Sequence, residues 1–124
     1  MTFSFNKSEK LKSEKLISAL FSSGKSISAY PLRLVYLKTT FENDIKLKTG
    51  VSVPKRNFKK AVDRIRIKRQ MREAYRLNKA MVFNNITTQY AFMILYISKE
   101  KSDYNLINSK TQKLFRGFLE ACEK

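Results

Sequence analysis

The sequence predicts an α+β fold with about four strands and three helices in the order α-β-β-(β)-α-β-α, the bracket marking a strand that can be divided in two. The 124 residues fit one small domain spanning 1–124. Apolar residues make up 43% of the chain, enough for one core. Three segments carry apolar residues at helical spacing, and the segments between them alternate or are continuously apolar. This pattern indicates a small sheet with helices packed against it.

The first helix is predicted within residues 9–22. Ser8 or Ser13 can serve as its N-cap, and Gly24 follows as a C-terminal stop. Its apolar side chains form two i,i+4 pairs on adjoining stripes, Leu16 with Leu20 and Ile17 with Phe21.

The strands are predicted from three further segments. Residues 26–38 alternate apolar and polar side chains at several positions, and Tyr30-Pro31 is a point where this strand can break. Residues 46–55 form the next strand, which Pro54 stops. Residues 89–98, QYAFMILYIS, are almost continuously apolar, which is typical of a strand buried on both faces.

The two remaining helices are predicted over residues 58–79 and 105–122. On a helical wheel of the first, the core face consists of Ile67, Met71, Ala74 and Tyr75. The opposite side carries Arg66, Arg69, Arg72 and Arg76. The apolar members of the last helix are Leu106, Leu114, Phe118 and Leu119.

The chain carries a formal net charge of +16, which favours a polyanionic partner. Half of this excess falls in residues 55–76, where ten basic residues and two acids leave a net charge of +8. A solvated helix face normally mixes charge signs so that i,i+4 ion pairs form, and this one barely does. Because arginine binds phosphate through two parallel hydrogen bonds, we predict a surface that binds the phosphate backbone of a nucleic acid, formed by Lys55, Arg56, Lys59, Lys60, Arg64, Arg66, Lys68, Arg69, Arg72 and Arg76.

Several classes of function are disfavoured by composition. The chain has no histidine, which removes the commonest general base and metal ligand, and its ten acids are dispersed. We therefore predict neither catalytic side chains nor a protein-bound metal. The single cysteine, Cys122, predicts an inert thiol in a reducing cytoplasm. Residues 1–15 lack the apolar segment of a secretory signal, and no run of about 18 apolar residues predicts a membrane span.

Residues 50–76, GVSVPKRNFKKAVDRIRIKRQMREAYR, resemble the signature of the protein subunit of bacterial ribonuclease P. In that family a strand ending in Ser-Val and two basic residues leads to Ala-Val, then Arg-Asn-Arg-x-Lys-Arg and an arginine-rich helix. LFSSGKS before the first strand, the late apolar strand and the final helix also fit. The chain departs from the pattern at Ile65, where the family has Asn. From the sequence, Ile65 either packs on a neighbouring loop or meets a ribose or base face.

The resemblance implies an accessory protein of a ribozyme. An RNA subunit would hold Mg²⁺ and hydrolyse the bond joining the 5′ leader to precursor tRNA, and one protein is expected per ribonuclease P RNA. The protein would bind this RNA through its basic helix and the single-stranded leader in a cleft between helix and sheet. By alignment, the leader-facing positions are Ile17, Phe21 and Tyr36. Core packing is the alternative for each of them.

Two other functions fit the composition. A ribosomal or chaperone-like RNA-binding protein without a processing role would have the same charge and size, and only the motif of residues 50–76 speaks against it. A DNA-binding protein would be expected to show a helix-turn-helix pattern, which we do not find in the sequence.

Overall fold

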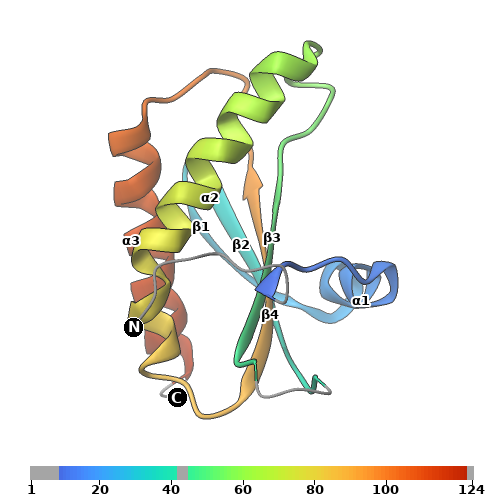
Figure 1. Cartoon of the computed structure of the whole chain (residues 1–124), viewed down its shortest axis with the longest axis vertical. Coiled ribbons are helices and arrows are strands. Elements are labelled where there is room, and N and C mark those ends of the chain that lie inside the picture. Colours follow the sequence, from blue (N-terminus) through green and yellow to red (C-terminus); the bar gives the residue numbers. More distant parts are fainter. Residues whose placement is uncertain (1–8, 42–44, 123–124) are drawn as a thin grey trace.

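The computed structural model describes residues 9–41 and 45–122. They form three layers, with a four-stranded sheet between one helix on one face and two helices on the other (Figure 1). The strand order is β1-β2-β4-β3, antiparallel except for the β3–β4 pair, which is parallel. The connection between these parallel strands runs through α2, as the crossover of a βαβ unit requires. The predicted α+β class and element order are confirmed.

Helix α1 (Glu14–Ser23) occupies the later part of the predicted 9–22 and ends one residue beyond it. The Ser13 side chain accepts a hydrogen bond from the Leu16 N–H and so acts as the N-cap. The other candidate, Ser8, lies outside the described residues. A start at residue 9, which Ser8 as the N-cap would imply, does not occur because residues 10 and 11 pair with the edge of the sheet instead.

Gly24 ends α1, as predicted, and it is required there because a side chain would not fit. Its φ is −73°, which any residue can adopt. A Cβ at this position would collide with the Leu20 carbonyl oxygen and come within 3.0 Å of Val35 Cγ1. A glycine therefore lets α1 end against the sheet.

The first predicted strand is divided at Tyr30-Pro31 into β1 (Lys25–Ala29) and β2 (Leu32–Thr39), which pair as a hairpin. The peptide bond between Tyr30 and Pro31 is cis. Strand β3 (Leu47–Ser52) ends before Pro54, and β4 (Gln89–Tyr96) forms the centre of the sheet beside β2.

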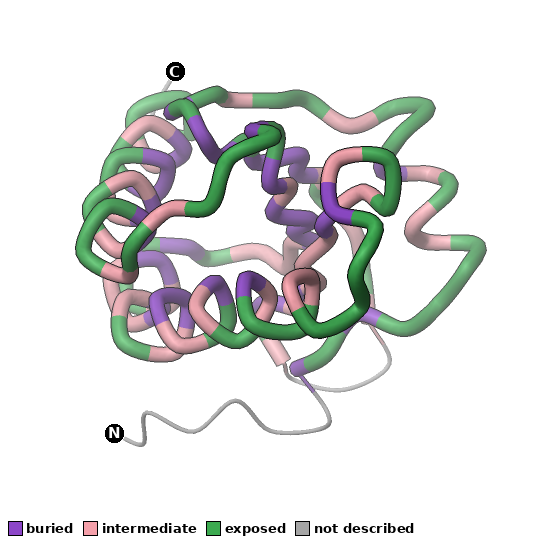
Figure 2. Tube along the Cα trace, turned by 90° about the horizontal axis from the view of Figure 1, so that it is seen from above, coloured by how far each residue is buried: buried purple, intermediate pink, exposed green. Residues whose placement is uncertain are grey.

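Strand β4 is buried on both faces, as its continuous apolar run predicts. Phe92, Ile94 and Tyr96 join the core beneath α2 and α3. Ala91 and Met93 join a second cluster beneath α1. Helices therefore cover both faces of the sheet, and the buried stretches of the chain face the interior (Figure 2).

Helix α2 (Ala61–Phe83) begins and ends later than the predicted 58–79. The predicted core face of Ile67, Met71, Ala74 and Tyr75 is confirmed, because all four are at most 1% exposed. The additional turn at the C-terminal end is held by the buried side chains of Lys79 and Val82.

Helix α3 (Tyr104–Cys122) packs beside α2. Its predicted core includes one error, because Leu106 is 40% exposed and Ile107 is fully buried in its place. The core side of α3 is formed by Ile107, Thr111, Leu114, Phe115 and Phe118, and Leu106 lies one residue outside this stripe. No helix in the described part of the chain combines the length and apolar character needed to cross a membrane.

Candidate nucleic-acid interface

The solvent side of α2 carries a row of arginines. Arg66, Arg69 and Arg72 are exposed and lie one turn apart, on the side of the helix away from Ile67 and Met71. No ion pair joins these three guanidinium groups to an acid within residues 9–41 or 45–122. Their positive charge is therefore presented to solvent rather than neutralised by the described chain.

The two arginines that flank this row are bound by the chain itself. Arg76 Nε donates a hydrogen bond of 3.0 Å to Glu73 Oε2, and the two side chains form an ion pair. Hydrogen bonding from Arg76 lowers the pKa of the Glu73 carboxyl, so this acid is ionised at neutral pH and offsets the charge of Arg76. Arg64 donates to the carbonyl oxygens of Phe58 and Lys59, at 2.7 and 3.0 Å.

The segment between β3 and α2 extends the charged surface. Lys55, Arg56, Lys59 and Lys60 are exposed there, and Lys68 is half-buried on α2. The other acid of this region, Asp63, pairs with Lys101 from the β4–α3 connection at 2.9 Å. The ten predicted RNA-binding residues thus follow one continuous stretch of chain. Arg76 is paired with Glu73 and Arg64 is bound to backbone carbonyl oxygens. The other eight form no ion pair with a described acid.

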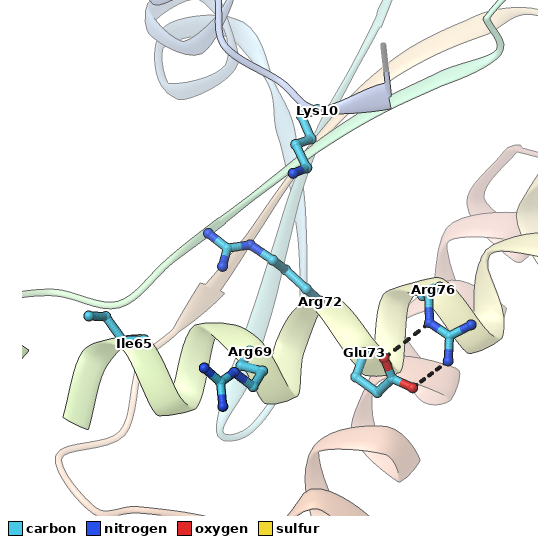
Figure 3. A pocket seen from close by; sticks show the side chains of 6 residues that line it. All are labelled: Lys10, Ile65, Arg69, Arg72, Glu73 and Arg76. Atoms are coloured by element: carbon cyan, nitrogen blue, oxygen red, sulfur yellow. Dashed lines mark hydrogen bonds and ion pairs between the residues drawn. The ribbon is translucent and has the colours of Figure 1, made fainter. Parts of the chain in front are cut away.

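A groove of about 270 Å³ runs along this side of α2 (Figure 3). Its lining comes from Ile65, Arg69, Arg72, Glu73 and Arg76 of the helix and from Lys10 of the segment before α1. Lys10 was not predicted as a site residue, because it falls within residues 9–22, where the first helix was expected. No local pattern marks it, since its place depends on pairing with a strand almost 40 residues away.

Ile65 lies in this groove with its side chain 56% exposed. It is therefore not packed beneath a neighbouring loop, which was one of the two alternatives. Val62, one turn earlier on α2, is 68% exposed. The arginine row is thus accompanied by two exposed apolar side chains.

The three predicted leader-facing residues are not brought together. Ile17 is partly buried against the cluster beneath α1, and Phe21 on the same helix is 57% exposed. Tyr36 is only 9% exposed and lies on the opposite face of the sheet. Its ring meets Phe118 edge to face, with the ring centroids 4.9 Å apart, and burial raises the pKa of its hydroxyl. The residues of β2 that face α1 are Val35 and Leu37.

Metal-binding residue types are scattered through the structure. Within residues 9–41 and 45–122, no three His, Cys, Asp or Glu side chains gather as they would around a metal ion. Cys122 is exposed near the end of α3, where its Sγ lies 3.5 Å from the Tyr90 hydroxyl.

Comparison with known proteins identifies relatives of the whole chain. A family model described as Ribonuclease P matches residues 5–119. The ribonuclease P protein component of Porphyromonas gingivalis is 38% identical over 117 residues, covering 90% of this chain and 84% of its own. The corresponding protein of Chlorobium phaeobacteroides is 38% identical over 131 aligned positions, covering 92% and 87%.

Solved structures share the fold. The RNase P protein of Staphylococcus aureus superposes with a TM-score of 0.72 at 17% identity, covering 90% of this chain and 96% of its own. That of Thermotoga maritima gives a TM-score of 0.69 at 23% identity, covering 87% and 96%. At these identities the likeness shows the architecture alone, whereas the family model and the closer relatives show descent. The chain therefore belongs to the ribonuclease P protein family.

Proposed function

We propose that this member of the ribonuclease P protein family binds the RNA subunit of its holoenzyme through the solvent side of α2 and the basic segment before it. The observation that carries the proposal is the row of Arg66, Arg69 and Arg72, exposed and without an acidic partner among the described residues. Self-repulsion of such a row opposes folding of the free protein, and phosphates relieve it. The whole chain 1–124 would act as one RNA-binding domain, which the family match over residues 5–119 supports.

As a member of this family, the chain is an accessory subunit of ribonuclease P, an endoribonuclease that acts in tRNA 5′ processing. Mg²⁺ supplies activation of the attacking water and stabilisation of the departing oxygen in phosphodiester hydrolysis of this kind. The described residues gather no ligand cluster for such an ion. In our proposal the RNA holds the metal, and the protein contributes binding and orientation.

The proposal extends to the precursor tRNA. A single-stranded leader needs an apolar or aromatic platform close to positive charge. Phe21 offers an exposed ring, and Ile17, one turn earlier on α1, offers a partly exposed aliphatic surface beside it. Tyr36 is left out because its ring is buried against α3. One protein per RNA completes the assembly, in the cytoplasm, where the single free thiol of Cys122 would stay reduced.

Reconstitution tests this function directly. The protein alone is expected to cleave nothing, and adding it to bacterial ribonuclease P RNA should restore 5′ leader removal at a low Mg²⁺ concentration where the RNA alone is inactive. The gain should be smaller for a precursor whose leader is cut to one nucleotide, because the contact with α1 is then lost. Cleavage by the purified protein, or an unchanged RNA activity, would contradict the proposal. Co-purification with ribosomes and not with ribonuclease P RNA would instead favour the ribosomal alternative.

Replacing Ile65 by Asn, the residue of the family motif, is expected to leave the fold intact. Since the side chain is already 56% exposed, the free energy of unfolding should change by less than about 0.5 kcal/mol. Affinity for ribonuclease P RNA should hold or improve, because an amide adds hydrogen-bonding capacity in a groove that faces phosphates. Thermal unfolding and filter binding measure the two effects. Ile67→Asn, at a buried position two residues away, provides the destabilising comparison.

A further inference from the structure

The segment before α1 is attached to the sheet rather than to its own helix. Lys10 forms a parallel bridge with Thr49, and the Leu11 N–H donates to the Thr49 carbonyl oxygen at 3.0 Å. Strand β3 is the last in the sheet order, so this segment covers its open edge. The contact places Lys10 beside the groove on α2 (Figure 3).

A buried ion pair fixes this arrangement. Glu9 Oε1 lies 2.8 Å from Lys79 Nζ of α2, and the two side chains are 9% and 6% exposed. The Lys79 ammonium also lies 5.5 Å from the centre of the Phe83 ring. Buried charge pairs cost much of what their attraction contributes, and one of their uses is to select a single geometry. Here the pair joins residues 70 positions apart and selects where the next residue, Lys10, is presented.

Lys10 is exposed and lines the groove opposite Arg72, with Arg69 along the same wall (Figure 3). The two walls therefore bring cations from separate segments to one space of about 270 Å³. Glu73, the acid in the groove lining, is engaged by Arg76 through two hydrogen bonds. A phosphate bound between the two walls would contact the ammonium group of Lys10 on one side and accept hydrogen bonds from the planar guanidinium of Arg72 on the other.

We propose that Lys10 is an RNA-phosphate-binding residue and that the Glu9–Lys79 pair positions it, so that one backbone phosphate is held between the segment before α1 and Arg72 of α2. This inference rests on the proposed RNA-binding function and deepens it, because it adds a second wall to a surface otherwise made by α2 and the loop before it. The phosphate can belong to ribonuclease P RNA or to precursor tRNA, and the two are separated by titrating each alone.

Lys10→Ala tests the contact, with Lys12→Ala as the matched control. Lys12 is a basic residue of the same segment, exposed and outside the groove. Lys10→Ala should weaken binding of one of the two RNAs about tenfold at moderate salt. The slope of log affinity against log salt should become shallower by roughly 0.7 to 0.9. Lys12→Ala should change neither quantity. Equal effects of the two substitutions would overturn the proposal.

Glu9→Gln tests the positioning role. It leaves the Lys10 side chain in place but weakens the attachment to Lys79. It should reproduce the affinity loss and the shallower salt slope of Lys10→Ala, and combining the two substitutions should add little to either alone. All variants are compared at a temperature where thermal unfolding shows them folded. A purely structural role predicts lowered stability with an unchanged salt slope, and this result would overturn the positioning role.

The same titrations separate the two levels of inference. If replacing Arg66, Arg69 and Arg72 weakens RNA binding while Lys10→Ala does not, the surface on α2 is correct and the second wall is wrong. If neither change weakens binding of either RNA, the proposed function itself fails.

Discussion

Replacing Arg66, Arg69 and Arg72 together by Gln is expected to weaken binding of ribonuclease P RNA roughly a thousandfold at moderate salt. A hydrogen bond from a charged donor contributes on the order of 1.5 kcal/mol, and three are lost. The fold should be unaffected, because all three side chains are exposed and form no ion pair with the described acids. Stability can even rise slightly, since a row of like charges is removed from one helix face. Affinity is measured by filter binding, and stability by thermal unfolding.

The salt dependence gives this prediction its sharper form. If about six phosphates are neutralised, log affinity should fall against log salt with a slope of roughly −4 to −5. Arg69→Ala or Arg72→Ala alone should make that slope shallower by about one, and the triple variant by about two to three. An unchanged slope would mean that these side chains face water in the complex.

Helix α3 supplies a matched control for the loss of three positive charges. Lys110, Lys113 and Arg116 have the same i, i+3, i+6 spacing on a helix of the same sheet face, outside the groove. Replacing them by Gln changes the net charge equally. A loss of affinity as large as that of the α2 variant would show that total charge, and not the arginine row, governs binding.

Lys79→Met is expected to destabilise the protein by about 3 to 5 kcal/mol. The substitution keeps an extended side chain but leaves the Glu9 carboxylate buried without its counter-ion, at 9% exposure. For a chain of this length the midpoint of thermal unfolding should fall by roughly 10 to 20 °C. A fall of only a few degrees would mean that Glu9 moves into water when its partner is removed.

Two comparisons assign this loss to burial. Lys101→Met breaks the 2.9 Å pair with Asp63, whose side chains are 54% and 22% exposed, and should cost less than about 1 kcal/mol. Adding Glu9→Leu to Lys79→Met removes the orphaned charge and should recover most of the stability. The same double variant would remain deficient in the Lys10 contact, because the geometric constraint of the pair is gone.

Most elements of the fold could be predicted locally. The continuous apolar run of β4 indicates a strand covered on both faces, and the spacing of Ile67, Met71, Ala74 and Tyr75 indicates the buried side of α2. The break at Tyr30-Pro31 follows from proline chemistry. Boundaries were less accurate, as at the start of α1, because the competing partner of residues 10 and 11 is a strand far away in sequence.

Only part of the candidate surface could be predicted, because the rest depends on contacts between segments far apart in the sequence. Arg66, Arg69 and Arg72 share a helix face by periodicity alone, so the spacing predicts their common exposure. Tyr36 and Phe21 cannot be placed in this way. The alternation of side chains along β2 directs Tyr36 into the core, whereas the packing of α1 on the sheet leaves Phe21 exposed to solvent.

By itself, the sequence determined the class of fold, the resemblance to the family and the charge of α2, because periodicity, motif spacing and charge can all be read along the chain. Tertiary structure alone decided that Lys10 shares a groove with Arg72, that Glu9 and Lys79 are buried together, and that Tyr36 belongs to the core. Each of these depends on which distant segment packs on which, and the free energy of that choice is shared among many contacts that no local pattern records.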